Sequence, residues 1–114
     1  MLRKQDQMRN VSVEKPRGGE GTVHFTHILE PDEILPSCTM FARLQLEPGA
    51  AVGEHAHTDD AEVYYILSGT MEVNDNGVLH KIGPGDVVYT AGGETHSIRN
   101  IGNETAEMLA VILR

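Results

Sequence analysis

The sequence predicts an all-β protein built as one antiparallel barrel or sandwich. Turn-forming residues interrupt the chain at intervals of roughly ten residues, which is typical of that class. The segments between the turns are rich in β-branched and aromatic residues, or alternate apolar with polar side chains. The length of 114 residues suffices for one modest core, and an apolar content of 39% indicates that the core is packed.

Eight segments are predicted to be strands. In chain order they are 22–29, 39–46, 62–67, 70–75, 78–82, 86–90, 96–100 and 106–113. The second shows the clearest alternation, because Met40, Ala42, Leu44 and Leu46 share one face while polar residues share the other. We therefore expect each strand to turn one face to the core.

The turns between these strands carry recognisable signals. Asn76-Gly77 between two short strands predicts a tight hairpin, since both residue types tolerate positive φ. The segment 83–86, Gly-Pro-Gly-Asp, predicts another tight turn that opens a strand. Only the segment 30–35 is compatible with a helical turn.

Charge and composition limit the partners. A formal net charge of −8 argues against binding to nucleic acid or to an anionic membrane surface. No apolar run approaches the ~20 residues needed to cross a bilayer, and the N-terminal residues lack a signal-peptide core. The single cysteine, Cys38, excludes an internal disulfide and suits a reducing compartment, so we expect a cytoplasmic protein.

Polar residues at the start of a buried strand suggest a metal site. His55 and His57 are two residues apart, so on a strand their side chains point to the same side. Glu62 begins the next predicted strand, which would lie beside the first if residues 58–61 form the connecting turn. His96 follows a later turn. Three imidazoles and a carboxylate suit one divalent ion such as Mn, Fe, Ni, Zn or Cu.

Two spaced motifs around these residues resemble those of the cupins. The first motif is Gly, five residues, His-x-His, a gap, Glu, six residues, Gly, and it is met by Gly49, His55, His57, Glu62 and Gly69. The second is met by Gly85, Gly93, His96 and Asn100, with Ala91 in place of a proline. The resemblance implies a small jelly-roll barrel, or double-stranded β-helix, whose mouth holds a divalent metal bound by the three histidines and Glu62.

The resemblance also suggests an organisation of the chain. Residues 37–114 would form the barrel with both motifs, and residues 1–36 would add the first strand or strands and a dimer contact. We expect a homodimer, because a small barrel leaves edge strands that need covering. The segment 21–29 is the expected contributor.

The four candidate ligands also have explanations that involve no metal, and other carboxylates lie near them in the sequence. The four polar residues could form an internal hydrogen-bond network in a barrel that has lost its metal, although such burial is costly. Glu54, Asp59 and Asp60 are alternative carboxylates, which we expect to be solvated charges in a turn.

Catalytic residues are left open. Tyr64 is in phase with Glu62 and either lines the cavity or belongs to the core. Arg43 either holds an anionic substrate or lies on the surface.

Two classes of function follow. The first is a metalloenzyme of the dioxygenase, decarboxylase or isomerase type, acting on a small organic acid or sugar. The second is a non-catalytic protein that binds or senses a small, possibly anionic molecule. The resemblance is compatible with both, because cupins host many reactions on one fold.

Overall fold

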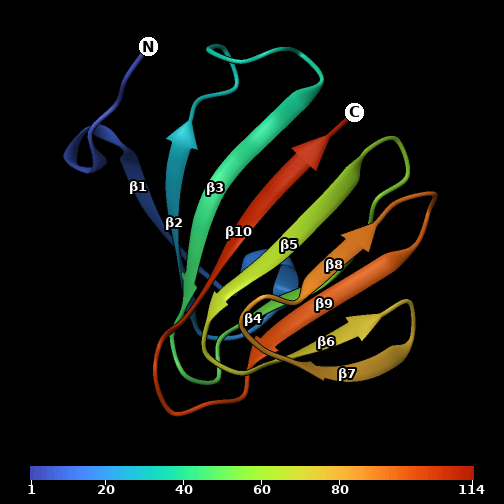
Figure 1. Cartoon of the computed structure of the whole chain (residues 1–114). Helices are drawn as coiled ribbons and strands as arrows, with labels where there is room; N and C mark the ends of the chain where they lie inside the picture. The colour runs from blue at the N-terminus through green and yellow to red at the C-terminus, as the bar shows by residue number, and fades with distance from the viewer.

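The computed structural model describes all 114 residues and consists of ten strands and two single-turn 3₁₀ helices (Figure 1). The strands are β1 (Arg9–Glu14), β2 (Thr22–Leu29), β3 (Cys38–Leu46), β4 (Ala51–Ala56), β5 (Ala61–Ser68), β6 (Met71–Asp75), β7 (Val78–Ile82), β8 (Val87–Thr90), β9 (Thr95–Asn100) and β10 (Ala106–Leu113). The helices are η1 (Gln5–Gln7) and η2 (Pro16–Gly18). The predicted all-β fold is confirmed.

The strands form two antiparallel sheets that face each other (Figure 1). The larger sheet has the order β1-β2-β3-β10-β5-β8, and the smaller has the order β4-β9-β6-β7. Strands far apart in sequence are neighbours in both sheets, as in a jelly roll: β3 pairs with β10, and β4 pairs with β9.

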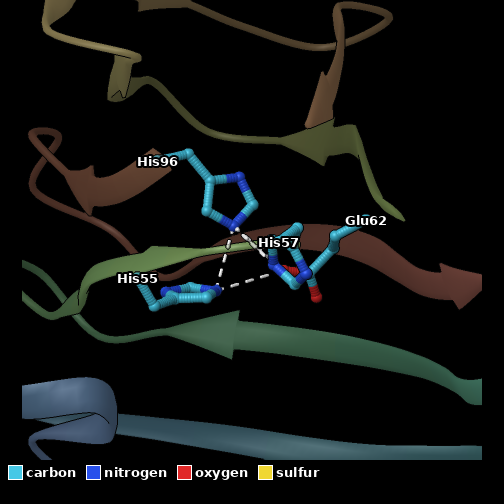
Figure 2. Close-up of side chains that lie close together, drawn as sticks. All are labelled: His55, His57, Glu62 and His96. Carbon is cyan, nitrogen blue, oxygen red and sulfur yellow. Dashed lines mark hydrogen bonds and ion pairs between the residues drawn. The ribbon is translucent and has the colours of Figure 1, made fainter. Parts of the chain in front are cut away.

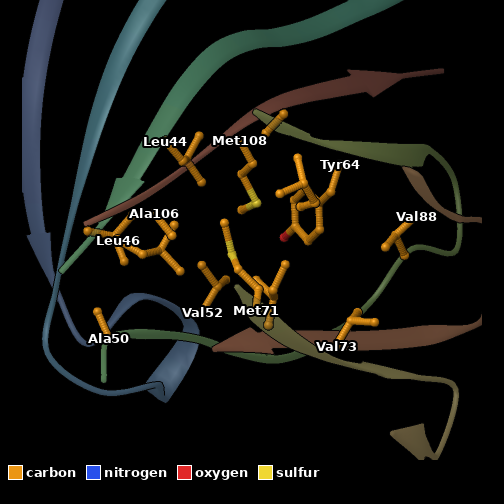
Figure 3. Packing of buried hydrophobic residues seen from close by; sticks show 14 of the residues in the cluster. Leu44, Leu46, Ala50, Val52, Tyr64, Met71, Val73, Val88, Ala106 and Met108 are labelled. Carbon is orange, nitrogen blue, oxygen red and sulfur yellow. The ribbon is translucent and has the colours of Figure 1, made fainter. Parts of the chain in front are cut away.

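The hydrophobic core fills the space between the two sheets (Figure 3). Inward-facing positions alternate with outward ones, so that in β5 Glu62, Tyr64 and Ile66 are buried while Tyr65 and Leu67 are exposed. Tyr64 is the one aromatic residue among the fifteen buried residues of the core; the others are aliphatic residues and methionines. Packing therefore relies on Val, Ile, Leu, Met and Ala side chains from both sheets.

Two turns agree with their sequence signals. In the β6–β7 hairpin, Asn76 and Gly77 both have positive φ, at 51° and 95°, and the Gly77 N–H donates to the Asn74 side chain at 2.8 Å. In the turn before β8, the Gly83 N–H donates to the Asp86 carboxylate at 2.9 Å. Each turn fixes the start of the strand that follows it.

The predicted helical content is wrong in position. Residues 30–33 form a turn closed by a hydrogen bond from Glu33 N–H to Glu30 C=O, and both 3₁₀ helices lie elsewhere. The N-cap of η2, Lys15, and the central residue, Arg17, are both left-handed, with φ of 50° and 54°. Sequence patterns give no signal for such a conformation at lysine or arginine.

Neither of the two short helices has the length or the apolar character that a membrane-spanning helix needs.

The N-terminal strands extend the larger sheet. β1, which was not among the predicted strands, pairs with β2 through six residue pairs and leaves an open edge. β2 is paired on both sides, with β1 and β3, so the expectation that the segment 21–29 supplies a free sheet edge is wrong. The largely exposed side chains of β1 explain why its periodicity is weak.

Candidate metal centre

Four polar side chains from both sheets meet at one end of the core (Figure 2). His55 on β4 and His96 on β9 are direct partners in the β4–β9 ladder, and His57 follows β4 by one residue. Glu62 reaches the group from β5 in the larger sheet. The expectation that β4 and β5 are neighbouring strands is therefore wrong, because these strands lie in different sheets and bring their side chains together across the interior.

A β-bulge turns His55 toward the interior. The ladder pairs Val52 with Ile98 but His55 with His96, so two residues of β4 stand opposite one residue of β9. Strict alternation would send residues 52 and 55 to opposite faces of the sheet. The extra residue restores the phase, so that both the core residue Val52 and His55 face inward.

The ligand-capable atoms of these residues converge closely. The Nε2 atom of His96 lies 3.0 Å from that of His55 and 3.2 Å from that of His57. Glu62 Oε1 lies 3.4 Å from His55 Nε2 and 3.0 Å from the Nε2 atoms of His57 and His96. All four atoms lie within 4.8 Å of one another.

The other ring nitrogens have partners that fix the tautomers of two histidines. His55 Nδ1–H donates to the Gly53 carbonyl at 2.8 Å, and His57 Nδ1–H donates to the Asp60 carboxylate at 2.7 Å. A carbonyl and a carboxylate only accept hydrogen bonds, so the proton of the neutral ring lies on Nδ1. The Nε2 lone pairs of both rings then face the cluster, as metal ligation requires.

Thr90 holds the His96 ring in place without fixing its tautomer, because a hydroxyl can donate or accept. Its hydroxyl lies 2.8 Å from His96 Nδ1, and both residues are completely buried or nearly so. Thr90 and Asp60 were not assigned to the site from sequence. Asp60 was expected to be a solvated charge, and the hydrogen bond to His57 corrects that expectation, whereas Glu54 and Asp59 are exposed as expected.

Burial makes this arrangement electrostatically demanding. His57, Glu62 and His96 are at most 3% exposed. Burial alone would raise the pKa of Glu62, but in the metal-free cluster Nε2–H groups of His55 and His96 that donate to the carboxylate lower its pKa to about 2, so it is ionised; with neutral rings protonated on Nδ1, a metal ion takes the place of these protons. Burial also opposes protonation of His55, yet its hydrogen bond to Glu62 raises its pKa above the ordinary value.

The cluster therefore suits a cation. A buried carboxylate and inward-facing imidazole lone pairs repel one another unless a proton or a metal ion lies between them. Three nitrogen donors and one oxygen donor match borderline divalent metals, and their hydrogen-bonded outer partners resemble those of known metal sites. The group could hold one metal ion, whose identity the donors leave open among Mn, Fe, Ni, Zn and Cu.

Tyr64 lies against the cluster. Its ring stacks on His96 with a centroid distance of 4.7 Å and an interplanar angle of 6°. Burial, together with the negative charge of Glu62, raises the pKa of the phenol well above its usual range. Tyr64 thus remains neutral, and it also lines the cavity beside the cluster.

Arg43 lies elsewhere. It belongs to the outward face of β3 and lines a polar groove with Asn10, Thr26 and Gln45. The structure does not bring it to the cluster, and its place on the outer face of β3 agrees with the second of the two alternatives, a residue outside this site. The reason is the alternation of β3, which sends Leu44 to the core and Arg43 to the other face.

A cavity of about 290 Å³ opens beside the cluster. Seven of its eleven lining residues are hydrophobic, and the polar ones are Arg17, His55, Glu62 and Tyr64. Arg17 was not predicted from sequence. It comes from η2, far from both motifs in the chain, so no spacing could have identified it.

Comparisons with known proteins identify the family of this chain. Residues 42–112 match the family model described as "Cupin domain". The chain belongs to the cupins. An "Oxalate-binding protein" of Thermotoga maritima is 44% identical over 101 residues, covering 89% of this chain and 84% of the relative.

Solved structures show the same fold. A crystal structure described as a predicted oxalate decarboxylase from Thermotoga maritima superposes with a TM-score of 0.94 at 40% identity, covering 99% of this cupin and 98% of that chain. The polyketide cyclase RemF from Streptomyces resistomycificus gives a TM-score of 0.79 at 18% identity, covering 99% and 80% of the two chains. At that identity the likeness concerns the fold alone.

We predict that His96→Ala sharply lowers metal occupancy without unfolding the protein. Losing one of four ligands leaves an open position that water fills poorly, while the apolar strands retain most of the core burial. Elemental analysis after purification and after reconstitution gives the metal content, and circular dichroism checks the fold. The unmodified protein should hold about one divalent ion per chain.

Glu54→Ala is the matched control for that experiment. Glu54 is exposed on the same strand as His55, so its removal should change neither metal content nor fold. Loss of metal in Glu54→Ala with retention in His96→Ala would contradict the assignment. Unfolding of His96→Ala while Glu54→Ala stays folded would show instead that the cluster serves the structure.

We also predict that metal affinity falls as the pH decreases from 8 to 5. Imidazoles bind metal only when neutral, and their ordinary pKa is about 6.5. The raised pKa of His55 means that protons begin to compete above that value in the metal-free protein. Chelator competition at fixed ionic strength measures the change, and a constant affinity over this range would contradict histidine ligation.

Proposed function

We propose that this cupin binds one divalent metal through His55, His57, Glu62 and His96 and uses it to bind a small carboxylate. The convergence of three imidazoles and one carboxylate within 4.8 Å is the observation that carries the proposal. The 44% identical oxalate-binding relative supports oxalate as the first candidate ligand.

The cavity fits a small anion better than a large molecule. Its volume of about 290 Å³ lies at the lower end of ligand pockets, which range from about 300 to 1,000 Å³. A bound divalent ion would supply a Lewis acid for carboxylate oxygens. The largely hydrophobic walls limit the water around the anion, and this strengthens its attraction to the cation.

Catalysis is the second candidate function, and Tyr64 favours it. Apart from the cluster residues, it is the only neutral lining residue with a polar hydrogen, so its phenol could donate a hydrogen bond to a bound ligand. A decarboxylase, dioxygenase or isomerase reaction can use such a donor to stabilise negative charge that develops on the ligand. Incubation of the metal-loaded protein with oxalate, followed by assays for carbon dioxide and formate, tests for decarboxylation.

We further propose that the protein works in the cytoplasm. Its one cysteine, Cys38, is a half-buried free thiol whose S–H donates to the Met40 carbonyl at 3.4 Å. A protein without disulfides suits a reducing compartment. The net charge of −8 supports our expectation that neither nucleic acid nor an anionic membrane is a partner.

We predict that the manganese-loaded protein binds oxalate and that the metal-stripped protein does not. Removal of the ion leaves the ionised Glu62 facing the anion, and this repels it. Isothermal titration calorimetry with and without Mn²⁺ measures the difference, which we expect to exceed about 100-fold in affinity, or roughly 2.7 kcal/mol. Equal binding by the two forms would contradict a metal-mediated site.

We also propose that two copies pair through the outer face of β10, β5 and β8. There, Leu109, Tyr65 and Val87 are successive cross-strand neighbours. Val87 and Tyr89 are 62% exposed. A contiguous apolar surface of this kind is typical of interaction sites.

A second copy is the occupant that this surface suits. Two of the chain's five phenylalanine and tyrosine residues, Tyr65 and Tyr89, lie exposed on it, and tyrosine is enriched at protein interfaces. Two chains of charge −8 repel each other elsewhere, so a largely apolar face offers the most favourable contact. A symmetric pair would cover the same patch on both chains.

We predict a homodimer that Tyr89→Asp separates. Light scattering should give twice the chain mass of 12.5 kDa for the unmodified protein and a single chain mass for the variant, because burying aspartate in an apolar contact is costly. Leu79→Asp is the control, since Leu79 is 61% exposed but lies on β7 in the other sheet. A monomeric unmodified protein at micromolar concentration would contradict the dimer.

A further inference from the structure

Arg17 supplies the one positive charge that lines the cavity outside the histidine cluster. The remaining lining residues are hydrophobic, except for Tyr64 and the cluster members His55 and Glu62. This cation stands out in a chain with 17 acidic and 9 basic residues.

The guanidinium of Arg17 makes no polar contact that stabilises the fold. Its side chain is exposed and makes no hydrogen bond or ion pair within the chain. By contrast, Arg3, Arg9 and Arg99 each form an ion pair with a glutamate. Arg17 therefore keeps all its donors available for an anion in the cavity, where a planar guanidinium can bind a carboxylate through two hydrogen bonds.

The backbone that carries Arg17 is strained. Both Lys15 and Arg17 adopt left-handed conformations, which cost non-glycine residues about 1–2 kcal/mol each. Pro16 between them is buried, and it also lines the cavity. Strain of this kind persists only where the surrounding structure enforces it, and it often accompanies a functional site.

The strand that carries His55 enforces this conformation. η2 packs against β4 (Figure 1), and a Cβ atom on Gly53 would lie 2.1 Å from the Arg17 carbonyl oxygen. Only glycine allows so close an approach. The Gly53 carbonyl also accepts the hydrogen bond that orients the His55 ring. Gly53, a residue of the β-bulge, therefore positions both His55 and Arg17.

We propose that Arg17 determines the specificity of the site for dianionic ligands, by binding carboxylate oxygens that the metal leaves free. This inference rests on the proposed function, in which the metal-loaded cluster binds a small carboxylate. A monocarboxylate satisfies only the metal. A dicarboxylate such as oxalate satisfies both the metal and Arg17, so the arginine favours the dianion.

The test compares oxalate with acetate on the manganese-loaded protein. Arg17→Gln should weaken oxalate binding about 10–100-fold, since a hydrogen bond to a charged group contributes about 1.5–3 kcal/mol. Acetate binding should change less than about threefold, and Mn²⁺ affinity should stay the same, because Arg17 is not a metal ligand. Calorimetry measures both anions, and chelator competition measures the metal.

Lys15→Gln is the matched control. Lys15 is in the same loop, has the same left-handed backbone and carries the same charge, but it does not line the cavity. Its replacement should leave oxalate binding unchanged. Equal weakening by both substitutions would show a general charge effect and would overturn the inference, as would equal loss of oxalate and acetate in Arg17→Gln.

A second variant protects the test against unfolding. Arg17→Gly removes the guanidinium and relieves the left-handed strain, so it should melt no earlier than the unmodified protein and lose oxalate affinity to the same extent as Arg17→Gln. If both Arg17 variants bind oxalate normally, the inference fails while the proposed function stands. If the unmodified, metal-loaded protein binds no oxalate, both fail.

Discussion

The structure depends on one electrostatic constraint: four electron-pair donors are buried together between two sheets. Glu62 is ionised, and the Nε2 lone pairs of His55 and His57 face it at 3.4 and 3.0 Å. In a medium that excludes water, such a group costs several kcal/mol per unpaired charge, so a proton or a metal ion between the donors stabilises it. The sandwich can carry this cost because its apolar core, away from the cluster, supplies the stability.

Hydrogen bonds outside the cluster hold the four donor side chains in position, and for His57 these include bonds of its backbone. His57 lies beyond the end of β4, where the strand ladder no longer fixes it. Its N–H and C=O are instead bonded to Glu94 and Gly93, at 3.1 and 2.9 Å, in the turn that leads to His96. The two histidines are thus connected through backbone as well as through their rings. Hydrogen bonds therefore hold all four side chains or their backbones in place, and such preorganisation favours metal binding because little ordering is left to occur on binding.

The sequence predicted the four cluster residues better than the strand arrangement and the cavity lining around them, for physical reasons. His55, His57, Glu62 and His96 could be grouped because polar side chains at the start of apolar strands are costly to bury unless an ion satisfies them. The arrangement of β4 and β5 in different sheets could not be predicted, because local periodicity carries no information on which strands pair. Arg17 could not be found either, since its position depends on a contact between distant backbone segments.

The four residues that could hold a metal and the arginine that we propose for ligand binding lie on different parts of the chain. The cluster residues lie on or directly beside β4, β5 and β9, in the rigid interior, whereas Arg17 comes from a strained helical turn. A substitution in that turn can change the charge of the cavity without disturbing a metal ligand. The same fold recurs in a polyketide cyclase at 18% identity. A fold alone does not determine a ligand, and our proposal assigns that role to the residues that line the cavity, of which Arg17 is the charged one outside the cluster.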